Sequence, residues 1–280
     1  MLNIGCIMRK SLKSKISYHA VYEDSLIDAI RFARENGFTG VQIPVELPYM
    51  SFENFSETDI EEIRMLKHEL GIRINLHAHD ETASLWEANR YLREGIYKYF
   101  RALLDFAKKV DAQLITIHVG SRPRYGTDTT PQRLLPARAE KHYIESLRQN
   151  LDFLISENNR PTTICVENYG FDTSVAEILE PFLQNGDIFL CWDIAKSFDN
   201  ELKINHEMEN YFRRNAKFIK QVHIHDKADD GCSHLVIGNG GIDFEDYLKF
   251  LQNYDILDYC IEVRPSSQAK KSLERLLTLF

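Results

Sequence analysis

The amino-acid sequence predicts an α/β protein, a (β/α)8 TIM barrel, folded as a single domain over residues 1–280. Short apolar runs rich in β-branched residues alternate about eight times with longer segments of helical period, and no linker interrupts the alternation. Most of these runs are continuous rather than alternating, which is typical of parallel strands covered by helices on both faces. The length of 280 residues slightly exceeds the roughly 250 residues of a typical barrel.

The predicted strands and helices alternate along the whole chain. We expect strands at residues 2–8, 40–44, 72–76, 113–117, 162–166, 188–192, 219–224 and 259–263. We expect helices at residues 24–36, 57–70, 87–110, 142–158, 174–184, 205–216, 244–253 and 268–279. Asp24 and Thr173 stand where helix N-caps are expected, and Gly71 stands where a helix should end. An open doubly wound sheet is the competing fold. It is disfavoured because no GxGxxG follows the first run, and eight strands would make an unusually wide open sheet.

Composition and charge describe a folded protein of the cytoplasm. Apolar residues make up 44% of the chain, the five cysteines form no CxxC pair, and no run approaches the roughly 18 apolar residues of a membrane span. Residues 1–10 carry their charges after a short apolar run, the reverse of a signal peptide. A formal net charge of -8 disfavours nucleic acid as a partner. We therefore expect a cytoplasmic protein without membrane association, and its sequence is compatible with a homo-oligomer.

Polar residues close six consecutive predicted strands. A barrel enzyme carries its chemistry at the C-terminal ends of its strands, so these residues should meet at one rim. A single histidine at a strand end more often anchors a loop than binds a ligand. Six such strands together indicate a cation, because unpaired buried carboxylates cost several kcal/mol each. The residues are His77 and His79 after the third strand, His118 after the fourth, Glu167 and Asn168 after the fifth, Asp193 after the sixth, His223, His225 and Asp226 after the seventh, and Glu262 and Arg264 after the eighth.

A divalent metal ion is the cation that fits these side chains best. Imidazole nitrogens and carboxylate oxygens without a cysteine pair suit Mn²⁺ or Zn²⁺, with Co²⁺ and Mg²⁺ as alternatives, better than an iron–sulfur cluster or a zinc–thiolate site. Lys196, Arg264 and the loop at residues 121–124 add positive charge near the predicted mouth, which would suit a phosphate or a carboxylate. We expect His19 to be structural or solvated, away from this rim.

The segment at residues 222–244 resembles a family pattern. It reads VHIHDKADDGCSHLVIGNGGIDF and is similar to the pattern HxHD, then His, then GxGxIDF, of the xylose-isomerase-like TIM barrel superfamily. That superfamily contains sugar and sugar-phosphate isomerases and epimerases and the endonuclease IV nucleases. The resemblance spans nearly the whole chain and implies that Glu167, Asp193, His223 and Glu262 bind a metal ion. It also implies that Glu167 and Glu262 exchange a proton beside a carbonyl through a metal-stabilised enediolate.

The resemblance to the nuclease branch is incomplete. His77, His118 and His234 stand where that branch has further histidine ligands. Lys196, however, replaces the histidine of a DxxH motif, and Cys232 replaces an aspartate. A protonated lysine would repel a further cation, so the resemblance implies one metal ion, or two, rather than three.

The function expected from the resemblance is that of a metal-dependent isomerase or epimerase in carbohydrate metabolism. Its substrate would be a small-molecule sugar or sugar phosphate. Three alternatives stay open: an endonuclease IV-like metal-dependent phosphodiesterase acting on abasic DNA, a metal-dependent dehydratase on the same barrel, and a non-catalytic binding barrel. The residues expected to contact the substrate are His77, His118, Lys196, His225, His234 and Arg264.

Overall fold

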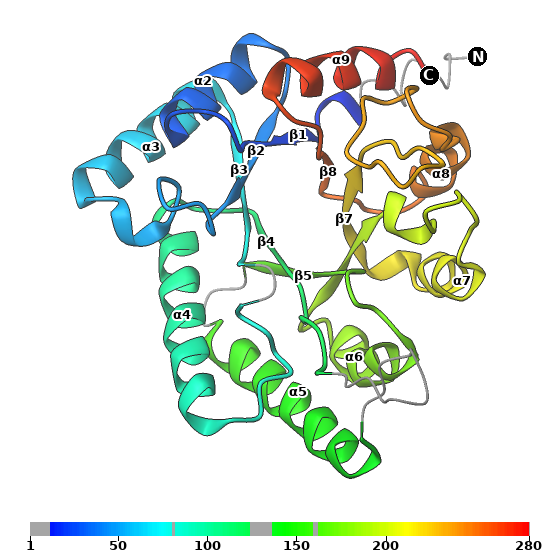
Figure 1. Cartoon of the computed structure of the whole chain (residues 1–280). Coiled ribbons are helices and arrows are strands. Elements are labelled where there is room, and N and C mark those ends of the chain that lie inside the picture. Colours follow the sequence, from blue (N-terminus) through cyan, green and yellow to red (C-terminus); the bar gives the residue numbers. More distant parts are fainter. Residues whose placement is uncertain (1–11, 80–81, 124–135, 159–161, 280) are drawn as a thin grey trace.

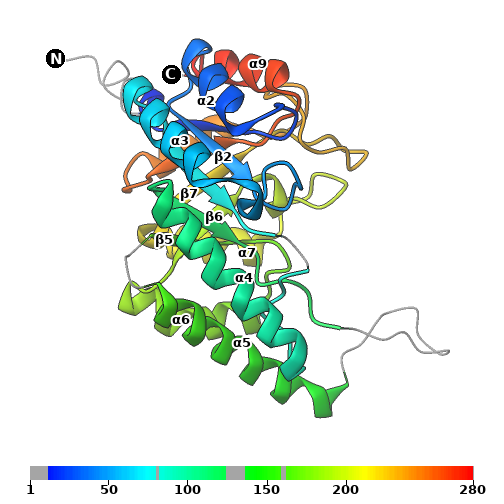
Figure 2. The same ribbon diagram turned by 90° about the vertical axis from the view of Figure 1, so that its left-hand side faces the viewer.

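Eight parallel strands close into a barrel in the computed structural model, in the order β1 to β8, and β8 pairs with β1. Figure 1 shows the helices arranged around the strands, and Figure 2 shows α4, α5 and α6 side by side along the barrel. The structure describes residues 12–79, 82–123, 136–158 and 162–279. The predicted (β/α)8 TIM barrel is confirmed.

The elements alternate in the order that the sequence predicts. The strands are β1 Ile16–His19, β2 Gly40–Pro44, β3 Arg73–His77, β4 Leu114–Ile117, β5 Thr163–Glu167, β6 Phe189–Asp193, β7 Ile219–Ile224 and β8 Asp258–Ile261. The helices are α2 Leu26–Glu35, α3 Glu57–Leu70, α4 Arg90–Lys109, α5 Ala137–Glu157, α6 Thr173–Asn185, α7 His206–Arg214, α8 Phe244–Leu251 and α9 Ser266–Leu276. Short 3₁₀ helices are η1 Phe52–Asn54, η2 Ala195–Ser197 and η3 Ala216–Phe218.

The first barrel strand does not lie where the sequence predicts it. The run at residues 2–8 lies outside the described residues, and the barrel begins with Ile16–His19, which pairs with β2 on one side and β8 on the other. This strand has the short sequence ISYH, in which Ser17 and His19 are polar. Because polar residues interrupt the continuous apolar pattern of a doubly covered parallel strand, the pattern does not reveal β1.

The remaining elements overlap their predicted positions. Helix α3 ends at Gly71 in the left-handed conformation, with φ 65°, as its glycine predicts. The N-cap of α2 is Ser25, one residue after the predicted Asp24, and the N-cap of α6 is Asp172, one residue before the predicted Thr173. Each N-cap side chain accepts a hydrogen bond from a first-turn backbone N–H. The predictions miss by one residue because the neighbouring side chain is also of a type that caps helices.

The barrel interior beneath the rim is polar, whereas the apolar core lies between the strands and the helices. Ser17 Oγ donates to Asp258 Oδ2 over 2.7 Å, and Gln42 Nε2 donates to Thr116 Oγ1 over 2.8 Å. Trp192 of β6 is buried, and its ring stacks on the ring of Phe212 in α7. Among the described residues, no helix combines the length and apolar character that crossing a bilayer requires.

Candidate metal and active site

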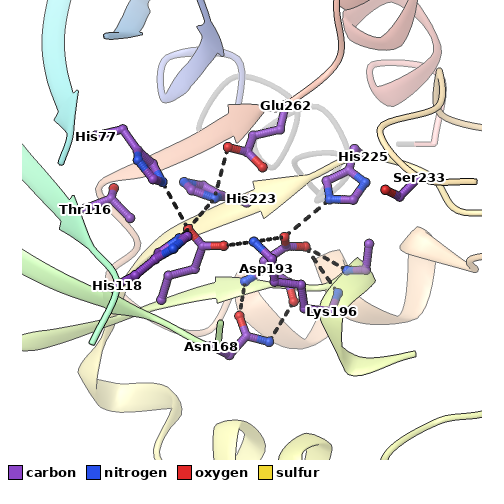
Figure 3. Close-up of polar contacts among 12 residues, drawn as sticks. His77, Thr116, His118, Asn168, Asp193, Lys196, His223, His225, Ser233 and Glu262 are labelled. Carbon is purple, nitrogen blue, oxygen red and sulfur yellow. Dashed lines mark hydrogen bonds and ion pairs between the residues drawn. The ribbon is translucent and has the colours of Figure 1, made fainter. Parts of the chain in front are cut away.

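Glu167, the last residue of β5, is fully buried and lies at the centre of the rim. Its Oε2 lies 3.0 Å from His118 Nε2, 3.3 Å from His77 Nε2 and 3.2 Å from His223 Nδ1. The three imidazoles come from β3, from just after β4 and from β7, and Figure 3 shows them directed toward one centre. Burial raises the pKa of the Glu167 carboxyl, but Lys196, His118 and His223 outweigh this effect and hold that pKa well below its usual range.

Lys196 lies between two carboxylates of the site. Its Nζ pairs with Glu167 Oε1 and also lies 3.0 Å from Asp193 Oδ2. The short helix η2, which begins two residues after Asp193, turns the lysine back over the end of β6. Burial lowers the pKa of the Lys196 ammonium, but Asp193 and Glu167 outweigh it and hold that pKa well above its usual value. Lys196 is therefore a cation held inside the site by two carboxylates, and its contact with a substrate stays a prediction.

Glu262, which follows β8, is the third buried carboxylate. Its oxygens lie 3.2 Å from His19 Nδ1, 3.6 Å from His223 Nδ1 and 3.7 Å from His234 Nε2. Burial raises the pKa of its carboxyl, but the neighbouring positive charge of His223 is the largest opposing effect, and the pKa falls well below its usual range. Glu262 and Glu167 thus approach the same nitrogen of His223 from neighbouring positions.

Asn168 holds the ends of β5 and β6 together. Its side chain donates through Nδ2 to the backbone oxygen of Asp193 over 2.9 Å, and its Oδ1 accepts from the Asp193 backbone N–H over 2.8 Å. The Asp193 carboxylate in turn accepts from the Ala195 N–H over 3.0 Å. These bonds fix the backbone on which both Glu167 and Asp193 are mounted.

The residues at the rim fit a divalent cation. His223 is fully buried, yet neither of its ring nitrogens makes a hydrogen bond of good geometry with the described residues. A buried imidazole in this state, among ionised carboxylates, has the donor chemistry of a metal ligand. Three groups have ligand atoms that all lie within 4.8 Å of one another: His77, Glu167 and His223; Asp193, His223 and Glu262; and His225, His234 and Glu262.

The four residues assigned to the metal by resemblance meet in two overlapping groups. His223 belongs to both, with Glu167 in one and with Asp193 and Glu262 in the other. Lys196 bridges Glu167 and Asp193 across the gap between them. His77 and His118, expected to contact the substrate, both lie against Glu167.

His225 and His234 form a stacked pair beside Asp193. Their ring centroids are 4.1 Å apart, and the backbone N–H of His234 donates to His225 Nδ1 over 3.0 Å. His225 Nε2 lies 3.3 Å from Asp193 Oδ2, so this histidine faces the site, as its shared parity with His223 on the strand implies. Cys232, two residues before His234, is exposed.

His19 belongs to the site, which corrects the expectation that it is structural or solvated. It is the last residue of β1, only 5% exposed, and its ring stacks on that of His77 at 5.7 Å. Burial lowers the pKa of His19 to about 4. The signal that could have revealed it is the alternation of Ser17 and His19 with apolar neighbours, which is the inward-facing parity of a strand ending at the rim.

Of the positive charges expected in the loop at residues 121–124, Arg122 does not face the site as a free cation. Its guanidinium pairs with Asp172 and lies over the Trp86 ring at 4.9 Å. Arg124 lies outside the described residues.

Asp226 organises the loop that carries His234. Its fully buried carboxylate accepts from the backbone N–H groups of Lys227, Gly238, Gly240 and Ile242, over 2.8–3.2 Å. A side chain at Gly240 would collide with the Lys227 backbone oxygen, so the close turn requires glycine there.

The variant Asp226→Asn is expected to lose about 2–3 kcal/mol of unfolding free energy, because an amide NH2 would oppose backbone donors that need an acceptor. Urea unfolding of wild type and variant measures this loss. Asp230→Asn is the matched control in the same loop, where the exposed carboxylate accepts from a single backbone N–H, that of Cys232. Equal stability of wild type and Asp226→Asn would show that the carboxylate does not hold the loop.

A closed barrel that gathers histidines and carboxylates at the C-terminal ends of its strands has a candidate metal site. The chain belongs to the xylose isomerase-like TIM barrel family, whose model matches residues 30–279. The uncharacterized protein MJ1614 of Methanocaldococcus jannaschii is 25% identical over 205 residues, which are 68% of this chain and 76% of that protein.

Solved structures share the fold over most of the chain. A D-tagatose 3-epimerase-like protein superposes with a TM-score of 0.74 at 20% identity, covering 95% of this chain and 96% of that one. Endonuclease IV from Thermus thermophilus superposes with a TM-score of 0.66 at 15% identity, covering 95% and 98%. Both branches named by the sequence resemblance are thus represented among proteins of this shape.

Proposed function

We propose that this protein is a metal-dependent isomerase or epimerase that moves a proton on the carbon beside a carbonyl of a sugar or sugar phosphate. One observation carries the proposal: two buried carboxylates, Glu167 and Glu262, lie 3.2 and 3.6 Å from the same nitrogen of His223. A pair of carboxylates so placed can act on one substrate carbon from two directions. The name of the D-tagatose 3-epimerase-like structure agrees with this chemistry.

The protein's own residues divide the work. Glu167, Asp193, His223 and Glu262 would hold the divalent cation, which when bound polarises the substrate carbonyl and stabilises negative charge on its oxygen. Glu167 and Glu262 have lowered pKa values, so each is ionised at neutral pH and can accept a proton. One carboxylate removes the proton from one face of the carbon. The other takes a proton from solvent and gives it to the opposite face, which inverts the centre, and the first then releases its proton to solvent.

A phosphodiesterase of the endonuclease IV kind is the second candidate, and the group His77, Glu167 and His223 favours it. With His118 also on Glu167, this group offers ligands for a second cation. Lys196 disfavours a third cation, because its ammonium already occupies the space between Glu167 and Asp193. A dehydratase would use the same carboxylates to remove the proton. The substrate would then lose a neighbouring hydroxyl group as water, and no proton would return to the carbon.

The proposal predicts that the protein loaded with Mn²⁺ exchanges a carbon-bound hydrogen of a ketose for deuterium in heavy water. NMR of candidate ketoses and ketose phosphates measures the exchange, and elemental analysis of the same sample is expected to give one or two metal ions per chain. Protein treated with a chelator should be inactive and should recover on addition of Mn²⁺. Absence of exchange with every ketose, together with cleavage of abasic DNA and three bound zinc ions, would transfer the assignment to the nuclease.

A further inference from the structure

Arg264 and His19 form a contact at the rim between β1 and β8. Arg264 Nη2 lies 2.9 Å from His19 Nδ1. Arginine has donors only, so the lone pair of Nδ1 accepts this bond and the ring proton resides on Nε2. The opposite tautomer would set an N–H of His19 against an N–H of Arg264.

Two polar atoms of this contact lack a partner. His19 Nε2 and Arg264 Nε are both buried without a hydrogen bond to any residue that the structure describes. The His19 side chain is only 4% exposed, so water has little access to its free N–H. A buried donor without a partner is costly unless an acceptor from outside the chain meets it.

Arg264 also differs from the other cations near the mouth. Lys196 pairs with Glu167 and Asp193, and Arg122 pairs with Asp172. Within residues 12–79, 82–123, 136–158 and 162–279, no carboxylate forms an ion pair with Arg264, whose Nη2 contacts the ring of His19. Its charge therefore remains available to a ligand.

We propose that Arg264 and His19 form an anion subsite that binds a carboxylate or phosphate group of the substrate. This inference rests on the proposed function, since it places the anionic end of the substrate beside Glu262, one of the two proton-transferring carboxylates. His19 Nδ1 lies 3.2 Å from Glu262 Oε1, so the subsite adjoins the reacting centre. A guanidinium with unused N–H groups and an imidazole N–H match the acceptor oxygens of either anion.

The test compares three unreactive polyols of similar size: sorbitol, gluconate and sorbitol 6-phosphate. Their affinities for the Mn²⁺-loaded protein are measured by titration calorimetry at constant ionic strength. Wild type is expected to bind at least one of the two anions roughly tenfold to a hundredfold more tightly than sorbitol, as charge-assisted hydrogen bonds imply. The tighter anion shows whether the subsite takes a carboxylate or a phosphate.

Arg264→Gln is expected to reduce that preference to less than about threefold, and Arg264→Lys to restore part of it through charge alone. Arg148→Gln, an exposed change on α5, is the matched control and should leave the preference intact. If Arg264→Gln does not fold by circular dichroism, His19→Gln and Arg264→Lys carry the comparison. Equal affinity of wild type for all three polyols, or an unchanged preference in the Arg264 variants, would overturn the subsite.

The outcome separates the two proposals. Deuterium exchange on neutral ketoses without an anion preference would leave the isomerase assignment standing and remove the subsite. An anion preference that depends on Arg264 without any exchange would keep the subsite and remove the assignment.

Discussion

Replacing Glu262 or Glu167 with Gln is expected to lower the rate of deuterium exchange by about a thousandfold, within the range that a positioned acid–base group contributes. An amide cannot accept the substrate proton, and it is also a weaker ligand than a carboxylate for a divalent cation. Both variants should therefore bind Mn²⁺ more weakly than wild type. NMR exchange rates and calorimetric Mn²⁺ titrations on the same preparations measure the two effects together.

Glu177→Gln is the matched control for these variants. Glu177 is exposed on α6, away from the rim, and its replacement should change neither exchange nor metal affinity. If Glu167→Gln and Glu262→Gln both exchanged deuterium at the wild-type rate, the two carboxylates would have no part in proton transfer.

Replacing Lys196 with Met is expected to cost the metal-free protein about 3 kcal/mol of unfolding free energy at neutral pH, because it leaves buried carboxylates without their counter-charge. The pKa values of Glu167 and Asp193 are lowered in the folded protein. Ionised carboxylates of this kind stabilise the fold above their unfolded-state pKa, and that contribution is lost as pH falls through the folded-state pKa. In the variant these pKa values rise, so acid protonates both groups and the cost of the substitution should shrink.

Urea unfolding of the metal-free protein at neutral pH and near pH 4.5, close to the ordinary pKa of a carboxyl, measures that change. Addition of Mn²⁺ should restore much of the lost stability of Lys196→Met, since a cation replaces the missing charge. Lys249→Met, which removes an exposed pair with Glu245, is the matched control and should have little effect. If Lys196→Met lost no unfolding free energy at neutral pH, or lost the same amount at both pH values, the result would contradict this role of Lys196.

The sequence predicts the barrel and most of the rim because each depends on local pattern. Continuous apolar runs specify doubly covered strands, and a polar residue at the end of such a run can only lie at the rim. Glu167, Asp193 and His223 could be found in this way. The structure places all three in fully buried positions at the ends of their strands.

The unpredicted features depend on contacts between distant segments. His19 ends a strand too short and too polar for the apolar pattern, and its place beside Glu262 follows only from closure of the barrel between β1 and β8. From the sequence, Lys196 is predicted to be a positive charge that can bind an anionic group of the substrate. Only the fold of η2 over β6 shows that its ammonium is already paired with two carboxylates.

We propose that Glu167, Asp193, His223 and Glu262 hold one divalent cation between them. Crystals soaked in MnCl2 and measured near the manganese absorption edge test it most directly, through the anomalous difference map. We expect a peak coordinated by these four side chains, with Lys196 Nζ displaced from the space between Glu167 and Asp193. A map without a peak there, or with manganese held only by His225, His234 and Glu262, would contradict it.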